Sequence, residues 1–158
     1  MSRAVIALGA NLGDARAALS GAVEALRARD GVEILAESSV YVTAPIGGVE
    51  QPDYLNAVVV VETDFAPFAL LAVLHEIENA WHRTREVRWG PRTLDLDLID
   101  FEGVVSDDPV LTLPHPRAHE RAFVLVPWLE VDPGAHLTGF GPVAALIPGL
   151  GDQGITIA

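Results

Sequence analysis

Hydrophobic and polar residues along the first 101 positions follow a pattern that predicts strands and helices in turn. Apolar or β-branched runs predict strands over residues 3–8, 32–43 and 54–63, and strict alternation predicts another over 93–101. Apolar residues at helical spacing predict helices over 15–28 and 67–82. The order β-α-β-β-α-β is that of an α+β protein with a ferredoxin-like core. We therefore expect an antiparallel sheet with both helices on one face.

The pattern becomes less regular after residue 101. A turn at Glu102 and Gly103 is followed by a loop over 114–116, a broken helix over 118–130 and a tail from Pro133 with many glycines and prolines. Neither a repeat nor a linker interrupts the chain, and 158 residues suit one hydrophobic core. The sequence thus predicts a single domain over residues 1–158, with an extra C-terminal segment of helix and loop.

Composition narrows the possible functions. The net charge of −12 argues against nucleic-acid binding, because phosphate backbones attract basic surfaces. The chain has no cysteine, which excludes disulfides and thiolate chemistry. It also has no lysine, which excludes a Walker phosphate loop, a protein-kinase site and Schiff-base catalysis. Neither a signal peptide nor an apolar stretch of roughly 20 residues is visible, so we expect a cytoplasmic protein without membrane contact.

The basic residues, all arginine, are unevenly distributed. Arg83, Arg85, Arg88 and Arg92 fall within ten residues of this acidic chain. Such a cluster indicates either a local anion site or a solvated charged loop.

Two carboxylates follow that cluster directly. Asp95 and Asp97 are two residues apart in a predicted strand, so both side chains point to the same face. A pair of this kind is either ordinary polar alternation at a strand edge or a site for Mg²⁺, which takes one or two protein carboxylates together with substrate phosphates. Arg92 lies three residues before Asp95, and carboxylates beside guanidinium groups favour a magnesium and polyphosphate site.

Aromatic and amide side chains suggest a second substrate. Tyr54 and Asn56 share one strand face and offer a flat surface and a paired donor and acceptor, which suits a heterocycle or an ordinary half-buried strand. Trp89 lies in the arginine-rich loop, where it acts either as core or as a lid over a ring. His115, between two prolines, is either a phosphate contact or a surface residue.

Several separate blocks of the chain together resemble the 6-hydroxymethyl-7,8-dihydropterin pyrophosphokinase family. The most specific block is RWGPRTLDLDLI at residues 88–99. The others, in the family's order, are ALGANLGD (7–14), QPDYLN (51–56), LPHPR (113–117) and ERAFVL (120–125). One departure is His82, which stands where the family usually has glycine at the end of the second helix.

The resemblance implies a reaction and a set of roles. The enzyme would transfer the terminal pyrophosphoryl unit of MgATP to the hydroxymethyl oxygen of the pterin in the folate pathway and release AMP. Two Mg²⁺ ions would be held by Asp95 and Asp97. The catalytic groups would be Arg83, Arg92, Asp97 and His115. ATP would be contacted by Leu71, His75, Arg85, Arg88, Trp89, Arg92, Leu98, Thr112, His115 and Arg121. The pterin would be contacted by Thr43, Ala44, Ile46, Tyr54, Asn56, Trp89 and Phe123, with its ring between Tyr54 and Phe123.

Two other functions remain open alongside this one. An Asp-x-Asp metal-dependent phosphohydrolase or glycosyltransferase accounts for the carboxylates and arginines but not for Tyr54, Asn56 or Trp89. A nucleotide-binding regulator on the same fold needs no metal carboxylates. We expect the partners to be ATP and the pterin, and the chain to act as a monomer.

Overall fold

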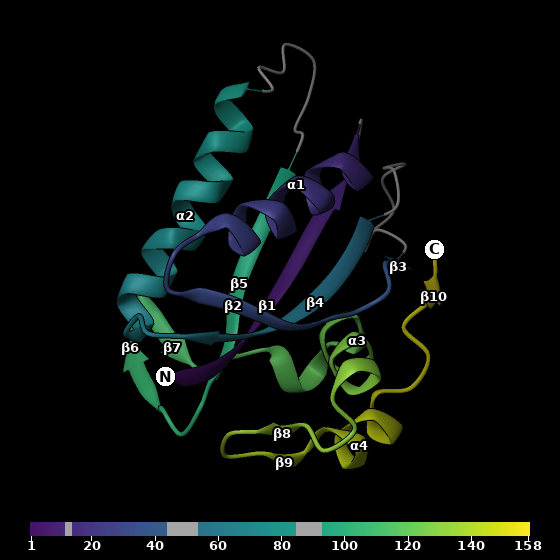
Figure 1. Cartoon of the computed structure of the whole chain (residues 1–158). Helices are drawn as coiled ribbons and strands as arrows, with labels where there is room; N and C mark the ends of the chain where they lie inside the picture. The colour runs from purple at the N-terminus through teal and green to yellow at the C-terminus, as the bar shows by residue number, and fades with distance from the viewer. Residues whose placement is uncertain (12–13, 44–53, 85–92) are drawn as a thin grey trace.

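A six-stranded antiparallel sheet forms the centre of the protein (Figure 1). The structure is a computed structural model that describes residues 1–11, 14–43, 54–84 and 93–158. The strand order is β10-β3-β4-β1-β5, and β2 also pairs with β4. The strands are β1 (Ser2–Asn11), β2 (Val32–Glu37), β3 (Tyr41–Thr43), β4 (Tyr54–Thr63), β5 (Thr93–Phe101) and β10 (Ile155–Ile157).

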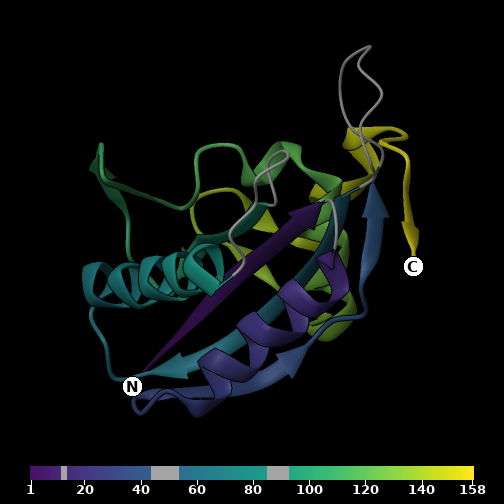
Figure 2. The same cartoon turned by 90° about the horizontal axis from the view of Figure 1, so that it is seen from above.

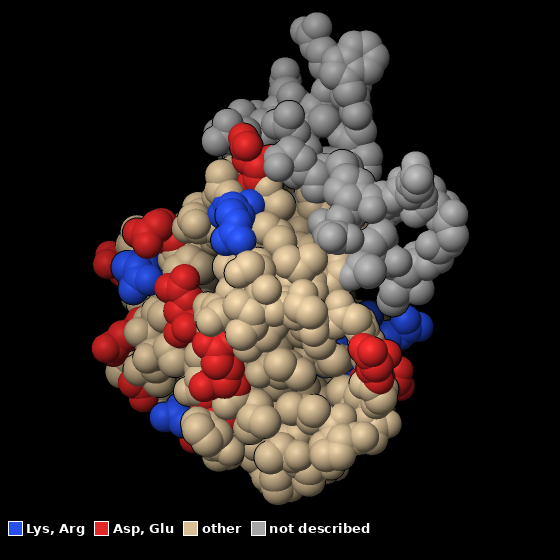
Figure 3. Space-filling view, turned by 90° about the vertical axis from the view of Figure 1, so that its right-hand side faces the viewer, with Lys and Arg blue, Asp and Glu red and all other residues tan. Residues whose placement is uncertain are grey.

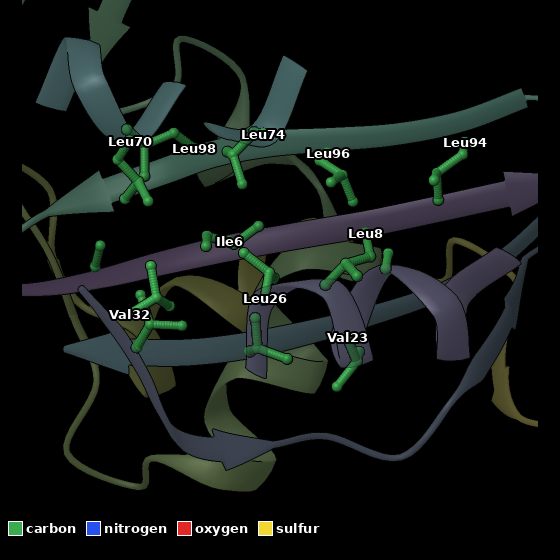
Figure 4. Close-up of a cluster of buried hydrophobic side chains, with 14 of the residues drawn as sticks. Ile6, Leu8, Val23, Leu26, Val32, Leu70, Leu74, Leu94, Leu96 and Leu98 are labelled. Atoms are coloured by element: carbon green, nitrogen blue, oxygen red, sulfur yellow. The ribbon is translucent and has the colours of Figure 1, made fainter. Parts of the chain in front are cut away.

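Two long helices, α1 (Ala15–Ala28) and α2 (Pro67–Thr84), cover one face of the sheet (Figure 2). Figure 4 shows the core between these layers, where helix side chains such as Leu26 and Leu74 meet Ile6 and Leu98 of the strands. The even-numbered leucines of β5 belong to this core, as the alternation along that strand predicts. The predicted ferredoxin-like arrangement is confirmed, and α2 continues through His82 to Thr84.

A sharp turn separates α1 from β2. Gly31 adopts a positive φ of 90°, and a Cβ atom there would lie 2.9 Å from the Phe65 ring. Glycine meets both constraints because it has no side chain. This turn returns the chain along β4, where Val32 pairs with Thr63.

The second face of the sheet carries a third helix. A 3-10 turn, η1 (Ala118–Glu120), leads into α3 (Ala122–Val131). Val124, Leu125 and Trp128 of α3 are buried against this face. The two predicted core helices share one face, as expected, and the broken helix predicted over 118–130 is η1 with α3, which packs on the other face.

The C-terminal segment is more ordered than its glycine and proline content predicts. Two short hairpins and two helical turns precede the last strand, and β10 extends the sheet beyond β3. These elements are β6 (Ser106–Asp108), β7 (Leu111–Leu113), β8 (His136–Leu137), β9 (Gly141–Pro142), α4 (Val143–Leu146) and η2 (Ile147–Leu150). None of the described helices combines the length and apolar character that crossing a membrane requires.

Candidate active site

One row across the sheet brings together the polar residues of two distant strands. Gly9 of β1 pairs with Asn56 of β4 on one side and with Asp95 of β5 on the other. The side chains of Asn56 and Asp95 project to the α3 side of the sheet, where Val58 and Ile99 of the same strands pack. Tyr54 and Asp97, each two residues away on the same strand, project to the same side. A Cβ on Gly9 would lie 3.4 Å from Oδ1 of Asn56. Because glycine has no side chain, the space between Asn56 and Asp95 stays open. The row spans two strand spacings, roughly 10 Å.

The two carboxylates of β5, Asp95 and Asp97, repel each other. Partial burial raises the pKa of Asp95, the nearby Asp97 carboxylate raises it further, and His82 opposes the shift. The Asp95 side chain is exposed and that of Asp97 is half-buried, so both are accessible to a ligand from solvent. A cation between them would relieve the repulsion.

A third carboxylate, Glu78 of α2, lies close to this pair. Its Oε2 accepts a hydrogen bond of 2.8 Å from the Leu96 N–H. Burial raises the pKa of Glu78; the Leu96 N–H and His75 oppose this, while Asp95 and Asp97 raise it further. Glu78 is not among the site residues predicted from the sequence, although its position four residues after Leu74 and seven after Leu71 puts it on the apolar stripe of the helix, where a charged residue is unusual.

The donor set fits magnesium that arrives with a phosphate substrate. Across the described residues, no group of three or more His, Cys, Asp and Glu side chains is arranged to hold a metal ion. Asp95 and Asp97 supply hard oxygen ligands on a rigid strand, and Mg²⁺ usually completes such a pair with water and substrate phosphates. The two carboxylates therefore suit a metal bound jointly by protein and nucleotide.

A cavity of about 300 Å³ opens beside Asp97, between α2, β5 and the β6–β7 hairpin. Six residues predicted for ATP or metal line it, and six others were not predicted. The predicted ones are Leu71, His75, Asp97, Leu98, Thr112 and His115; the others are Glu78, Leu96, Pro109, Val110, Leu111 and Pro116. Pro109, Val110 and Leu111 of the hairpin were missed because nothing local in the sequence shows that this turn lies against α2.

His115 lies at the boundary between the cavity and the carboxylates. Its backbone N–H donates to the Ile99 carbonyl at 2.8 Å, and its Nδ1 accepts from the Arg117 N–H at 3.2 Å. Burial lowers the pKa of His115, Asp97 opposes the shift, and Arg121 and Arg117 lower it further. The lowered pKa favours the neutral imidazole, and because Nδ1 accepts a hydrogen bond, the proton of that neutral form lies on Nε2, which makes Nε2 a hydrogen-bond donor.

The predicted pterin contacts that the structure describes lie along β3, β4 and the start of α3. Asn56 is buried, and its Nδ2 donates to Thr43 Oγ1 at 2.8 Å, which fixes the orientation of the amide. Tyr54 and Phe123 are both half-buried, and the Arg121 guanidinium lies 5.4 Å from the centre of the Phe123 ring. The remaining predicted site residues, Ala44, Ile46, Arg85, Arg88, Trp89 and Arg92, and the side chain of Arg83, lie outside the described part of the chain.

Sequence comparison decides the family. A family model of the 7,8-dihydro-6-hydroxymethylpterin-pyrophosphokinase (HPPK) family matches residues 5–133. The chain belongs to the HPPK family. Similar HPPK-family proteins include the 2-amino-4-hydroxy-6-hydroxymethyldihydropteridine pyrophosphokinase of Methylorubrum extorquens, which is 46% identical over 139 residues and 88% of each chain. The protein of the same name from Bacillus subtilis is 45% identical over 81% of this chain and 77% of its own.

Solved structures agree on the fold. A Plasmodium falciparum HPPK-DHPS structure with pteroate superposes with a TM-score of 0.71 at 14% identity and covers 94% of this chain. A second HPPK-DHPS structure, in complex with substrates, gives a TM-score of 0.72 at 14% identity. The chain spans only 42% and 43% of those two longer chains, so the likeness concerns the HPPK fold alone.

Proposed function

We propose that this HPPK-family chain transfers the pyrophosphoryl group of ATP to 6-hydroxymethyl-7,8-dihydropterin, which gives AMP and the pterin diphosphate in folate biosynthesis. The row Asn56, Gly9 and Asp95 carries the proposal. It sets an amide suited to a heterocycle roughly 10 Å from carboxylates suited to a metal and a triphosphate. A phosphohydrolase or a nucleotide-binding regulator does not need a binding position for a heterocycle beside its phosphate site.

Asp95 and Asp97 would hold two Mg²⁺ ions around the triphosphate. The metal would neutralise charge on the phosphate oxygens and orient the β-phosphorus toward the pterin hydroxyl. Both aspartates stand on a rigid strand whose leucines are packed in the core, and this fixes their positions before substrate binds. Glu78, whose Oε2 is held by the Leu96 N–H, would place a third carboxyl group close to them.

The cavity beside Asp97 would hold the adenosine. Leu71 and Leu98 offer apolar surface, and His75 and Thr112 offer polar contacts at its edge. Neutral His115 would donate from Nε2 to a phosphate oxygen, and Arg121 would add positive charge. By family resemblance, the chemistry would also use Arg83 and Arg92 to stabilise charge, with Arg85, Arg88 and Trp89 as further ATP contacts.

The pterin would lie over the opposite end of the row. Its ring would stack between Tyr54 and Phe123, and Asn56 would read its amide-like edge in an orientation set by Thr43. Ala44, Ile46 and Trp89 would complete this part of the site by resemblance. Burial of the ring there would favour the reaction over ATP hydrolysis because it excludes water from the acceptor side.

We further propose that the chain works as a monomer in the cytoplasm, without nucleic-acid or membrane partners. The net charge of −12 supports the absence of a nucleic-acid partner.

The direct test incubates the protein with MgATP, with and without the hydroxymethyl dihydropterin, and separates the adenine nucleotides. AMP that appears only with the pterin supports the proposal. ADP, inorganic phosphate or no turnover at all would contradict it.

A further inference from the structure

The C-terminal tail contacts the Arg121 segment through one side chain. Oε1 of Gln153 accepts a hydrogen bond from the Ala122 N–H at 2.9 Å, and Nε2 of Gln153 donates to the Glu120 carbonyl at 2.9 Å. The carboxamide thus pairs with the backbone on both sides of Arg121, as a neighbouring strand would. It spans 31 and 33 residues of sequence to do so.

This contact stands in for a missing helix cap. Arg121 is the N-cap of α3 and makes no side-chain capping bond. The first N–H groups of a helix lack partners within the helix, and Gln153 supplies one for Ala122. The start of α3, which carries Phe123, is therefore fixed from outside the helix.

The same tail is anchored to the other side of the proposed pterin site. Two residues after Gln153, β10 pairs with β3, and Ile155 lies opposite Thr43. Thr43 Oγ1 in turn accepts the hydrogen bond from Asn56 Nδ2, so the tail links both sides of the site. In Figure 1, β10 runs beside β3 on the right of the molecule, and Figure 3 shows this side, where residues other than Lys, Arg, Asp and Glu fill the centre of the surface.

We propose that Gln153 is a positioning residue that sets the separation of the two walls of the pterin site, Thr43–Asn56 on the sheet and Arg121–Phe123 at the start of α3. The inference rests on the proposed function, since it concerns the same site. The tail lies beyond residues 5–133, the part of the chain that the family model matches. Gln153 itself touches no proposed substrate group; it acts through the backbone of Ala122 and Glu120.

The experiment compares Gln153→Ala and Gln153→Glu with wild type, with Thr156→Ala as the control on the exposed surface of β10. Gln153→Ala should raise KM for the pterin by about tenfold and KM for ATP by a smaller factor, up to about threefold, because Arg121 is one of several proposed ATP contacts. Gln153→Glu keeps the acceptor for Ala122 but sets an oxygen against the Glu120 carbonyl, so its pterin KM should lie in between. Thr156→Ala should match wild type in both constants.

Amide hydrogen exchange gives a readout that is independent of turnover. Exchange at Ala122 should become at least tenfold faster in Gln153→Ala and stay unchanged in Thr156→Ala. A lower melting temperature with an unchanged pterin KM would overturn the proposal, because it would make Gln153 a structural cap only. Wild-type protein without pterin-dependent AMP would count against the proposed function instead, and unchanged exchange at Ala122 would then still overturn the role of Gln153.

Discussion

Replacement of Asp95 by asparagine tests whether β5 holds two carboxylates together against their repulsion. Side chains two residues apart on a strand are roughly 7 Å apart. Two unit charges at this distance repel by about 0.6 kcal/mol in water and about 2.4 kcal/mol at an effective dielectric constant of about 20. The Asp95 side chain is exposed, so solvent screening brings the expected repulsion to about 0.5–1 kcal/mol. Asp95→Asn should therefore be more stable than wild type by about this amount without metal.

The pH dependence gives the sign of the effect. The pKa of Asp95 is raised by burial and by Asp97, so the folded protein binds this proton more tightly than the unfolded chain. The stability that protonation contributes is fully present below the unfolded pKa of about 3.9 and is lost as the pH rises through the folded value. The advantage of Asp95→Asn should hence be absent near pH 3.5 and complete by about pH 7.

The assay is thermal unfolding in EDTA across this pH range, with Asp107→Asn on the exposed β6 strand as control. An advantage of 0.5–1 kcal/mol corresponds to about 1–4 °C in Tm for a chain of this size. Added MgATP should stabilise wild type more than Asp95→Asn, because wild type keeps both ligands. An Asp95→Asn variant that is no more stable than wild type at pH 7, with the same pH profile, would refute the reasoning.

Three further changes probe other parts of the site. Asp97→Ala should lower kcat by on the order of 100-fold or more while the pterin Kd from fluorescence titration changes less than about threefold; normal turnover would remove the metal assignment. Asn56→Ala should raise KM for the pterin by about tenfold with little change for ATP, since it removes the amide that Thr43 orients, and equal effects on both substrates would contradict its role. Glu130→Gln should cost about 1 kcal/mol at pH 7 by denaturant unfolding, because burial alone would raise the pKa of Glu130 but hydrogen bonds from Tyr41 and Ser39 lower it; a difference that does not shrink as the pH falls from the unfolded pKa of about 4.3 through the lower folded value would contradict this account.

Local patterns in the sequence predict much of the fold. The bounds expected for α1, β4 and β5 agree with the structure because each has a long, regular hydrophobic period. The predicted strand over 32–43 is instead two strands, since Ser38 leaves the ladder and its hydroxyl accepts from the Val58 N–H at 2.9 Å. The three-residue β10 has no pattern of its own and forms through backbone pairing with a distant strand.

The site shows the same division between local and distant information. A period of two is enough to place Asp95 with Asp97, and Tyr54 with Asn56, on common faces. Their meeting across Gly9 depends on the register of three strands far apart in sequence, which local spacing does not contain. Glu78 and Gln153 were missed because the backbone groups that they bind belong to other elements, distant in sequence.

The route of the transferred phosphates tests the central claim most directly. Wild-type protein is incubated with ATP labelled at the β-phosphorus, Mg²⁺ and 6-hydroxymethyl-7,8-dihydropterin, and the label is followed into each product. Pyrophosphoryl transfer predicts that all consumed label appears in the pterin diphosphate, with one AMP released for each pterin diphosphate formed. Label that remains in ADP, or that appears in inorganic phosphate or pyrophosphate without pterin product, would contradict the account.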